Sequence, residues 1–205
     1  MEILGKLFGS PARVKIMRLF LLNPDIGFDT ATIAVRTKVS SKTARGELAS
    51  LASIKFIKKR TVIKEGKTKS KRVPGWVFNP DFKYRRHIQD LLVDGSFLQK
   101  DELMKRFQSV GKIKLMLISG VFLHEKDSRA DILIVGDNLK KNLIEQTVKN
   151  LEAEIGKELS YAMFETQEFI YRINMYDKLV RDILDYPHER LIDSREFSTH
   201  ALKKA

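Results

Sequence analysis

The chain has 205 residues, of which 43% are apolar, a length and composition typical of one or two globular domains. It contains no cysteine, which excludes disulfide bonds, thiolate zinc sites and cysteine nucleophiles. Its longest apolar stretches, such as residues 115–123, are far shorter than the roughly 20 residues of a membrane span. Residues 1–15 lack the apolar run of a secretory signal, so we expect a cytoplasmic protein without membrane contact.

The net charge of +12 lies entirely in the first half of the chain. Residues 1–95 contain 20 Lys and Arg against 8 Asp and Glu, whereas residues 96–205 contain 18 against 18. A charge excess confined to one half favours a polyanion partner for that half over a general role in solubility. The first half is therefore the candidate nucleic-acid-binding part.

Two helices are predicted before residue 40. Ser10 is expected to cap the first helix, with Pro11 at its first position, and apolar residues recur at helical spacing until Asn23-Pro24. Thr30 is the expected cap of a second, short helix over residues 31–37.

A third helix is predicted to follow Ser40. Its apolar stripe consists of residues spaced for one helix face, namely Ala44, Leu48 and Leu51. The opposite face carries short polar and basic residues, namely Ser41, Lys42, Thr43 and Arg45. A helix N-terminus favours phosphate, and Arg, Lys and Thr side chains are able to reach base edges. The alternative is a face that is merely solvated.

A basic hairpin is predicted next, from strands at residues 56–64 and 72–78 that are joined at Glu65-Gly66, with Phe28 as a short edge strand. Residues 55–72 contain nine Lys and Arg and one Glu. Alternating β-branched residues flank this charge, which favours an ordered hairpin over a disordered basic segment.

The segments SPARVKIMRLFLLNPD and SSKTARGELASLASIKFIKKR resemble winged-helix regulators of the arsenic-repressor type, over residues 8–79. The resemblance implies that one helix enters the major groove of DNA while the hairpin follows the adjacent backbone. We expect a homodimer on double-stranded DNA, with RNA binding or a protein-interaction role as alternatives. The candidate DNA-binding residues are Arg36, Lys38, Ser41, Lys42, Thr43, Arg45, Lys67, Lys69, Lys71 and Arg72.

A connecting helix is predicted from a cap at Asp81 through Leu92, after a tryptophan, Trp76, that is interpreted as a packing residue. Ser96 and Gln99 have the spacing of a capping box and are expected to start another helix. Strands and helices then alternate, which predicts a small α/β layer. The strands are expected at residues 112–119, 129–135 and 159–164, and the helices at residues 139–155 and 166–185.

Gly120 at the end of one strand and Asp131 near the start of the next resemble the polymerase-beta-like nucleotidyltransferase superfamily, over residues 97–192. The resemblance implies a Gly-Ser turn for the triphosphate and an Asp-x-Asp pair for two Mg²⁺ ions. Here Val121 replaces the serine and Leu133 replaces the second carboxylate, and leucine cannot bind a hard cation. We therefore expect no metal, no cofactor and no catalytic residue. A possible nucleotide pocket is still expected at Ser119, Gly120 and Asp131.

The predicted fold class is α+β, and the predicted function is a sequence-specific DNA-binding transcriptional regulator. Its second domain is expected to act in dimerisation or in sensing a nucleotide or protein effector. One alternative is an active nucleotidyltransferase that uses Asp131 with Mg²⁺ and a nucleotide, and another is an antitoxin-like interaction module. The predicted division is a winged helix-turn-helix domain at 1–80, a connecting helix at 81–95, a nucleotidyltransferase-like domain at 96–192 and a loose basic tail at 193–205.

Overall fold

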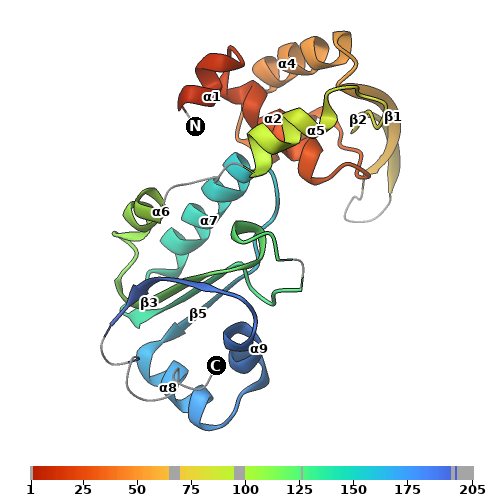
Figure 1. Cartoon of the computed structure of the whole chain (residues 1–205). Coiled ribbons are helices and arrows are strands. Elements are labelled where there is room, and N and C mark those ends of the chain that lie inside the picture. Colours follow the sequence, from red (N-terminus) through yellow and green to blue (C-terminus); the bar gives the residue numbers. More distant parts are fainter. Residues whose placement is uncertain (1, 65–69, 95–99, 126, 195–196, 198–205) are drawn as a thin grey trace. The chain divides into compact units, whose positions relative to one another are not determined.

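The computed structural model in Figure 1 describes all residues except 1, 65–69, 95–99, 126, 195–196 and 198–205. The chain divides into two compact units. The first comprises residues 1–97 and 149–157, and the second comprises residues 98–148 and 158–205. Each unit combines helices with a small sheet, as expected for the α+β class.

The N-terminal part of the first unit is helical. Ser10 is the predicted cap, since its hydroxyl accepts the amide of Arg13, and Ser40 caps in the same way through the amide of Thr43. A helix over residues 2–7 was not predicted. The helices are α1 (Glu2–Leu7), α2 (Pro11–Leu22), α3 (Thr30–Thr37) and α4 (Ser41–Ser53).

The cap of α3 is Asp29, and the prediction of Thr30 is wrong. Oδ1 of Asp29 accepts the amides of Ala31 and Thr32 at 2.8 and 3.0 Å. Thr30 is instead the first helical residue. Aspartate is as good an N-cap as serine, so residue type alone cannot decide whether Asp29 or Thr30 is the cap.

The predicted hairpin is confirmed, with strands β1 (Ile57–Lys64) and β2 (Lys71–Phe78) paired in antiparallel register from Ile57–Phe78 to Lys64–Lys71. Phe28 forms the predicted edge bridge, to Trp76. The buried core of this unit joins the apolar faces of the helices to the base of the hairpin. Its largest buried side chains include Phe20, Ile33, Leu48, Leu51, Phe56 and Phe78.

The connecting segment is shorter and less regular than predicted. It contains α5 (Arg85–Gln89), which follows Tyr84 without a side-chain cap, and a π-helical turn, η1 (Asp90–Asp94). Asp81 therefore does not cap this helix. Within the turn Leu92 is fully buried, whereas Leu91 is 45% exposed. The predicted capping box at residues 96 and 99 lies outside the described residues.

The second unit contains a four-stranded sheet of order β5-β4-β3-β6. Strand β3 is antiparallel to β4 and β6, and β4 is parallel to β5. The predicted strand at 129–135 begins and ends later than expected, at Ile132 and Asp137. The strands are β3 (Lys112–Ile118), β4 (Ile132–Asp137), β5 (Tyr161–Glu165) and β6 (Glu189–Asp193).

The predicted helix over residues 166–185 is in fact two helices. Tyr176 adopts a left-handed conformation with φ of 55°, and Asp177 caps the second helix by accepting the amide of Val180. Figure 1 shows both helices on one side of the sheet, where Phe169 and Val180 pack into its core. The helices of this part of the chain are α6 (Lys100–Phe107), η2 (Gly120–Phe122, a 3-10 turn), α7 (Lys141–Ile155), α8 (Thr166–Asn174) and α9 (Lys178–Asp185).

Strand β6 was not predicted, because its own short segment shows no clear alternation of apolar and polar residues. The tail predicted to be loose from residue 193 begins in ordered structure. The amide of Ser194 donates to the carbonyl of Lys114 at 2.8 Å, and Phe197 is 4% exposed within the core of the second unit. The remaining tail residues lie outside the described residues.

Candidate functional site

The N-terminal face of α4 is exposed to solvent. Ser41, Lys42, Thr43 and Arg45 are all exposed, while Ala44 on the other face is fully buried. Sequence patterning thus separated the two faces of the helix correctly. Within the described part of the chain, the side chains of Lys42 and Arg45 form no hydrogen bond or ion pair. The hydroxyl of Thr43 lies 2.8 Å from that of Ser40 and belongs to the helix cap.

Arg36 and Lys38, predicted to flank the reading helix, have structural partners. The guanidinium carbon of Arg36 lies 5.2 Å from the centre of the Phe28 ring. Lys38 ends α3 in a left-handed conformation with φ of 51°, and its ammonium donates to Oδ1 of Asn150. Both residues are thus already used within the first unit, and α4 is the better candidate for reading bases.

The open end of the hairpin is basic. Lys71 and Arg72 are exposed at the start of β2, whereas the predicted residues Lys67 and Lys69 lie outside the described residues. Lys64, which was not predicted as a site residue, is paired with Asp29 at 3.3 Å. This ion pair joins the hairpin to the start of α3. Lys71 and Arg72 are therefore described cations at this end of the hairpin that are available for phosphate.

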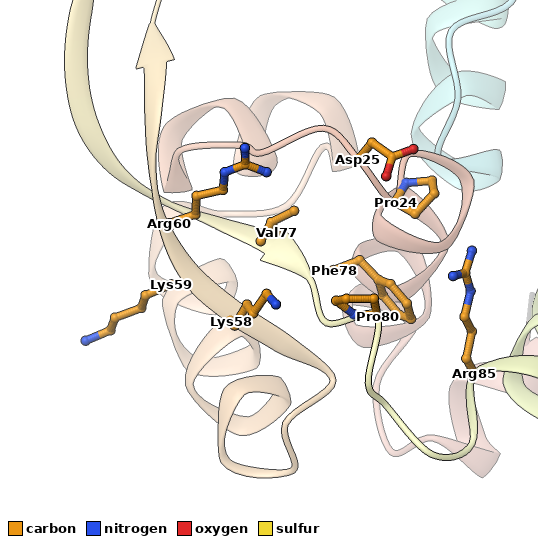
Figure 2. A pocket seen from close by; sticks show the side chains of 9 residues that line it. All are labelled: Pro24, Asp25, Lys58, Lys59, Arg60, Val77, Phe78, Pro80 and Arg85. Carbon is orange, nitrogen blue, oxygen red and sulfur yellow. The ribbon is translucent and has the colours of Figure 1, made fainter.

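A second cationic group lies at the base of the hairpin and was missed by the sequence reasoning. Lys58 and Arg60 on β1 line a hollow together with Arg85 from the start of α5 (Figure 2). The signal was present in the sequence, because cations two residues apart on a strand share one face. The contribution of Arg85 to this hollow could not be predicted from the sequence, since it depends on how α5 packs.

In the second unit, Asp131 acts as a hydrogen-bond hub. Its Oδ1 accepts the amide of Val121 and its Oδ2 accepts the amide of Ser160, both at 2.7 Å. Its backbone carbonyl accepts the amide of Ser119 at 2.9 Å. The carboxylate thereby links η2 to Ser160, which immediately precedes β5. These hydrogen bonds explain an aspartate at this position without a metal ion.

Gly120 is fitted to that carboxylate. It has φ of +54°, a conformation that favours glycine, and a Cβ at this position would clash with Oδ1 of Asp131 and lie 3.0 Å from its Cγ. The hydroxyl of Ser119, which is 3% exposed, donates to the carbonyl of Pro187 at 2.5 Å. The three predicted pocket residues therefore lie together, but their polar groups bind one another and the backbone.

Leu133 is the second residue of β4 and follows Asp131 by two positions. It is 1% exposed and belongs to an apolar cluster. Ala162 is its partner on β5, so this neighbour supplies no carboxylate either. The other members of the cluster are Leu115, Leu117, Ala130, Val135, Phe164, Phe169, Val180, Ile183 and Phe197. Leu133 is thus packed beneath α8 and α9.

Asp137, at the far end of β4, has partners of its own. It accepts the hydroxyl of Thr166 at 2.5 Å and pairs with Lys114 at 3.0 Å. These hydrogen bonds, that of Thr166 first, hold the pKa of Asp137 below its usual value. Among the described residues no three side chains of His, Asp or Glu are grouped so that they could hold a metal ion.

Comparison with protein-family models, curated proteins and solved structures gives no match. The helices of residues 2–64, 70–94, 100–125 and 127–194 include none that has the length and apolar character needed to cross a bilayer.

Proposed function

We propose that the chain is a sequence-specific DNA-binding transcriptional regulator. Its first unit is proposed to be a winged helix-turn-helix similar to the arsenic-repressor type, and its second unit a nucleotidyltransferase-like domain without turnover. The protein is proposed to act as a homodimer, because one winged helix reads few bases and a two-fold protein reads paired half-sites.

The observation that carries this proposal is the free cationic face at the start of α4. Lys42 and Arg45 are exposed and without a partner among the described residues, at the end of a helix whose amides and dipole already favour phosphate. A merely solvated helix face would not explain the exposed hairpin that follows it in sequence, where Lys71 and Arg72 are also without a partner among the described residues.

The two cationic groups are proposed to have different roles. Lys42, Thr43 and Arg45 would contact base edges in the major groove, where Arg and Lys donate to guanine. Lys71 and Arg72, with the neighbouring Lys67 and Lys69, would contact phosphates, which supply affinity without sequence information.

The second unit is proposed to serve dimerisation or the sensing of a partner. Its mixed sheet and the Gly120–Asp131 turn support a relationship to the nucleotidyltransferase fold, while the burial of Leu133 and the two amides held by Asp131 argue against the use of this turn for metal-dependent transfer. No specific contact in the described chain favours the enzyme or the antitoxin-like alternative.

Selection of bound fragments from random duplex DNA tests the proposal. The expected result is recovery of a palindromic sequence, whose half-site spacing reports the dimer. The recovered duplex should bind at least 100-fold more tightly than a scrambled duplex or a structured RNA, measured by fluorescence anisotropy at fixed salt, in keeping with usual specificity ratios of about 10³ or more. Recovery of no common sequence, or equal binding to RNA, would refute it.

A further inference from the structure

A hollow of about 760 Å³ that is open to solvent lies at the base of the hairpin, within the first unit. Such a volume is in the range of small-molecule sites, which is about 300–1,000 Å³. Figure 2 shows the lining side chains, which come from the turn after α2, from both strands and from the segment that leads into α5. They are Pro24, Asp25, Lys58, Lys59, Arg60, Val77, Phe78, Pro80 and Arg85.

Strand alternation divides the three consecutive cations of β1. Lys58 and Arg60 share one face, opposite Val77 and Gly75 of β2. The ammonium of Lys59 is on the other face, 5.9 Å from the centre of the Trp76 ring. Figure 2 shows the Lys59 side chain directed away from the hollow and that of Lys58 directed toward Phe78 and Pro80. All three cations of β1 line the hollow, and the side chain of Lys59 is directed away from it.

Arg85 supplies a third cation from a different element. Its guanidinium carbon lies 5.2 Å from the centre of the Phe78 ring, and the stacking fixes the position of the charge. Within the described chain, the side chains of Lys58, Arg60 and Arg85 form no ion pair or hydrogen bond, and neither does the exposed Asp25. The side chains of Lys58, Arg60 and Arg85 thus line one concave surface, and its acidic residue, Asp25, forms no ion pair with them within the described chain.

The positive charges of Lys58, Arg60 and Arg85 indicate the charge of the ligand. Three like charges repel one another, so a ligand with two or more negative charges would relieve the repulsion. The fork of an arginine matches the oxygens of phosphate. The hollow is far larger than one phosphate, its walls at Pro24 and Pro80 are apolar, and the carboxylate of Asp25 is a free acceptor for a sugar hydroxyl.

We propose that this hollow binds a small molecule with two or more phosphate charges, of the nucleoside di- or triphosphate class. The site is separate from the turn at Ser119, Gly120 and Asp131, whose polar groups already have partners. It is also separate from the open end of the hairpin, since Lys58 precedes Lys64 by six residues of strand, about 20 Å. The proposal does not depend on DNA binding.

Isothermal titration of the full chain with ATP, in EDTA and at about 0.1 M salt, tests the proposal. ATP and pyrophosphate are both expected to bind, and adenosine is not, because the phosphates supply most of the attraction. Lys58→Gln and Arg60→Gln should each weaken ATP binding by tenfold or more. Lys71→Gln makes the same change of net charge at the open end of the hairpin, outside the hollow, and should change ATP binding by less than twofold.

Absence of ATP binding to the unaltered chain would overturn the proposal. An equal loss in Lys71→Gln and Lys58→Gln would also overturn it, because the attraction would then be a general effect of charge. Thermal unfolding of each variant verifies that the fold is kept, and Arg85→Gln provides a second readout from a different element.

Duplex binding distinguishes a small-molecule site from a further contact with the DNA backbone. Lys58→Gln and Arg60→Gln should leave the affinity for duplex DNA, and its dependence on salt, within twofold of the unaltered chain. A drop in the salt slope as large as that of Lys71→Gln would assign the hollow to DNA phosphates and refute the proposal.

Discussion

The carboxylate of Asp131 occupies the space that a side chain at position 120 would need. Gly120 has φ of +54°, and the amide of Val121 that follows it donates to Oδ1 of Asp131 at 2.7 Å. The pair of glycine and aspartate that resembles a nucleotidyltransferase motif is therefore explained by folding. A substitution of Gly120 therefore has a steric effect, and a substitution of Asp131 removes hydrogen bonds.

Gly120→Ala and Asp131→Ala should both destabilise the chain. The alanine at position 120 would be strained and would clash with the carboxylate, and loss of the carboxylate would leave the amides of Val121 and Ser160 without their acceptor. We expect each change to lower the free energy of unfolding by about 2–4 kcal/mol, since hydrogen bonds to a charged group contribute about 1.5–3 kcal/mol each. Denaturant unfolding measures this. Asp127→Ala, an exposed carboxylate before β4, should cost less than about 0.5 kcal/mol.

Incubation with labelled ATP or CTP and Mg²⁺ addresses the enzyme alternative. We expect no label on protein, RNA or small molecules, because Leu133 is packed in the apolar core and cannot bind a cation. Label transfer that is lost in Asp131→Asn would contradict this expectation. Asp127→Asn, at an exposed carboxylate before β4, is the matched control, because it makes the same change of charge outside this turn.

Local signals in the sequence predicted most of the first unit. The caps at Ser10 and Ser40, the buried stripe of α4 and the hairpin all follow from residue type and spacing within a few positions. The cap of α3 was assigned one residue too late, because Asp29 and Thr30 are both capable caps. Its ion pair with Lys64 joins residues far apart in sequence, which no local pattern contains.

The second unit was predicted less completely. The division of α8 from α9 depends on a left-handed Tyr176, a conformation for which tyrosine gives no signal. Strand β6 pairs with β3 across more than 70 positions, and its short sequence resembles a loop. The cationic hollow in the first unit was missed for a similar reason, since Arg85 reaches it only through the packing of α5.

Arg45→Ala and Lys71→Gln should affect DNA binding differently. Loss of an arginine that contacts base edges should reduce the discrimination between the selected and a mismatched duplex by about 1–3 kcal/mol. Loss of Lys71 should weaken binding to all duplexes and reduce the salt slope by about 0.9 for the lost phosphate contact. Anisotropy titrations at several salt concentrations measure both effects. Identical behaviour of the two variants would show that these roles are assigned wrongly.

Arg18→Met should destabilise the first unit. Arg18 is 3% exposed, and it donates to the carbonyls of Leu92 and Glu154 at 2.8 and 3.1 Å. Burial lowers its pKa, and the nearby Glu154 partly opposes this. Methionine keeps the volume but leaves the carbonyls unpaired, so we expect a loss of about 2–4 kcal/mol in the free energy of unfolding. Arg86→Met, at an exposed position of α5, should have little effect in the same denaturant experiment.

Asp29 should make folding sensitive to acid. Burial disfavours its charge, but hydrogen bonds from the amide and hydroxyl of Thr32 and from Lys64 outweigh that effect, and the pKa of Asp29 lies below its usual value of 3.8. A lowered pKa in the folded state contributes stability above the unfolded value, and this stability is lost as the pH falls through the folded value. Unfolding followed between about pH 5 and pH 2 should therefore show a shallower loss of stability in Asp29→Asn, which retains a capping oxygen. Asp81→Asn, at an exposed position, should follow the unaltered chain, and the same acid limb in all three proteins would contradict the role of Asp29.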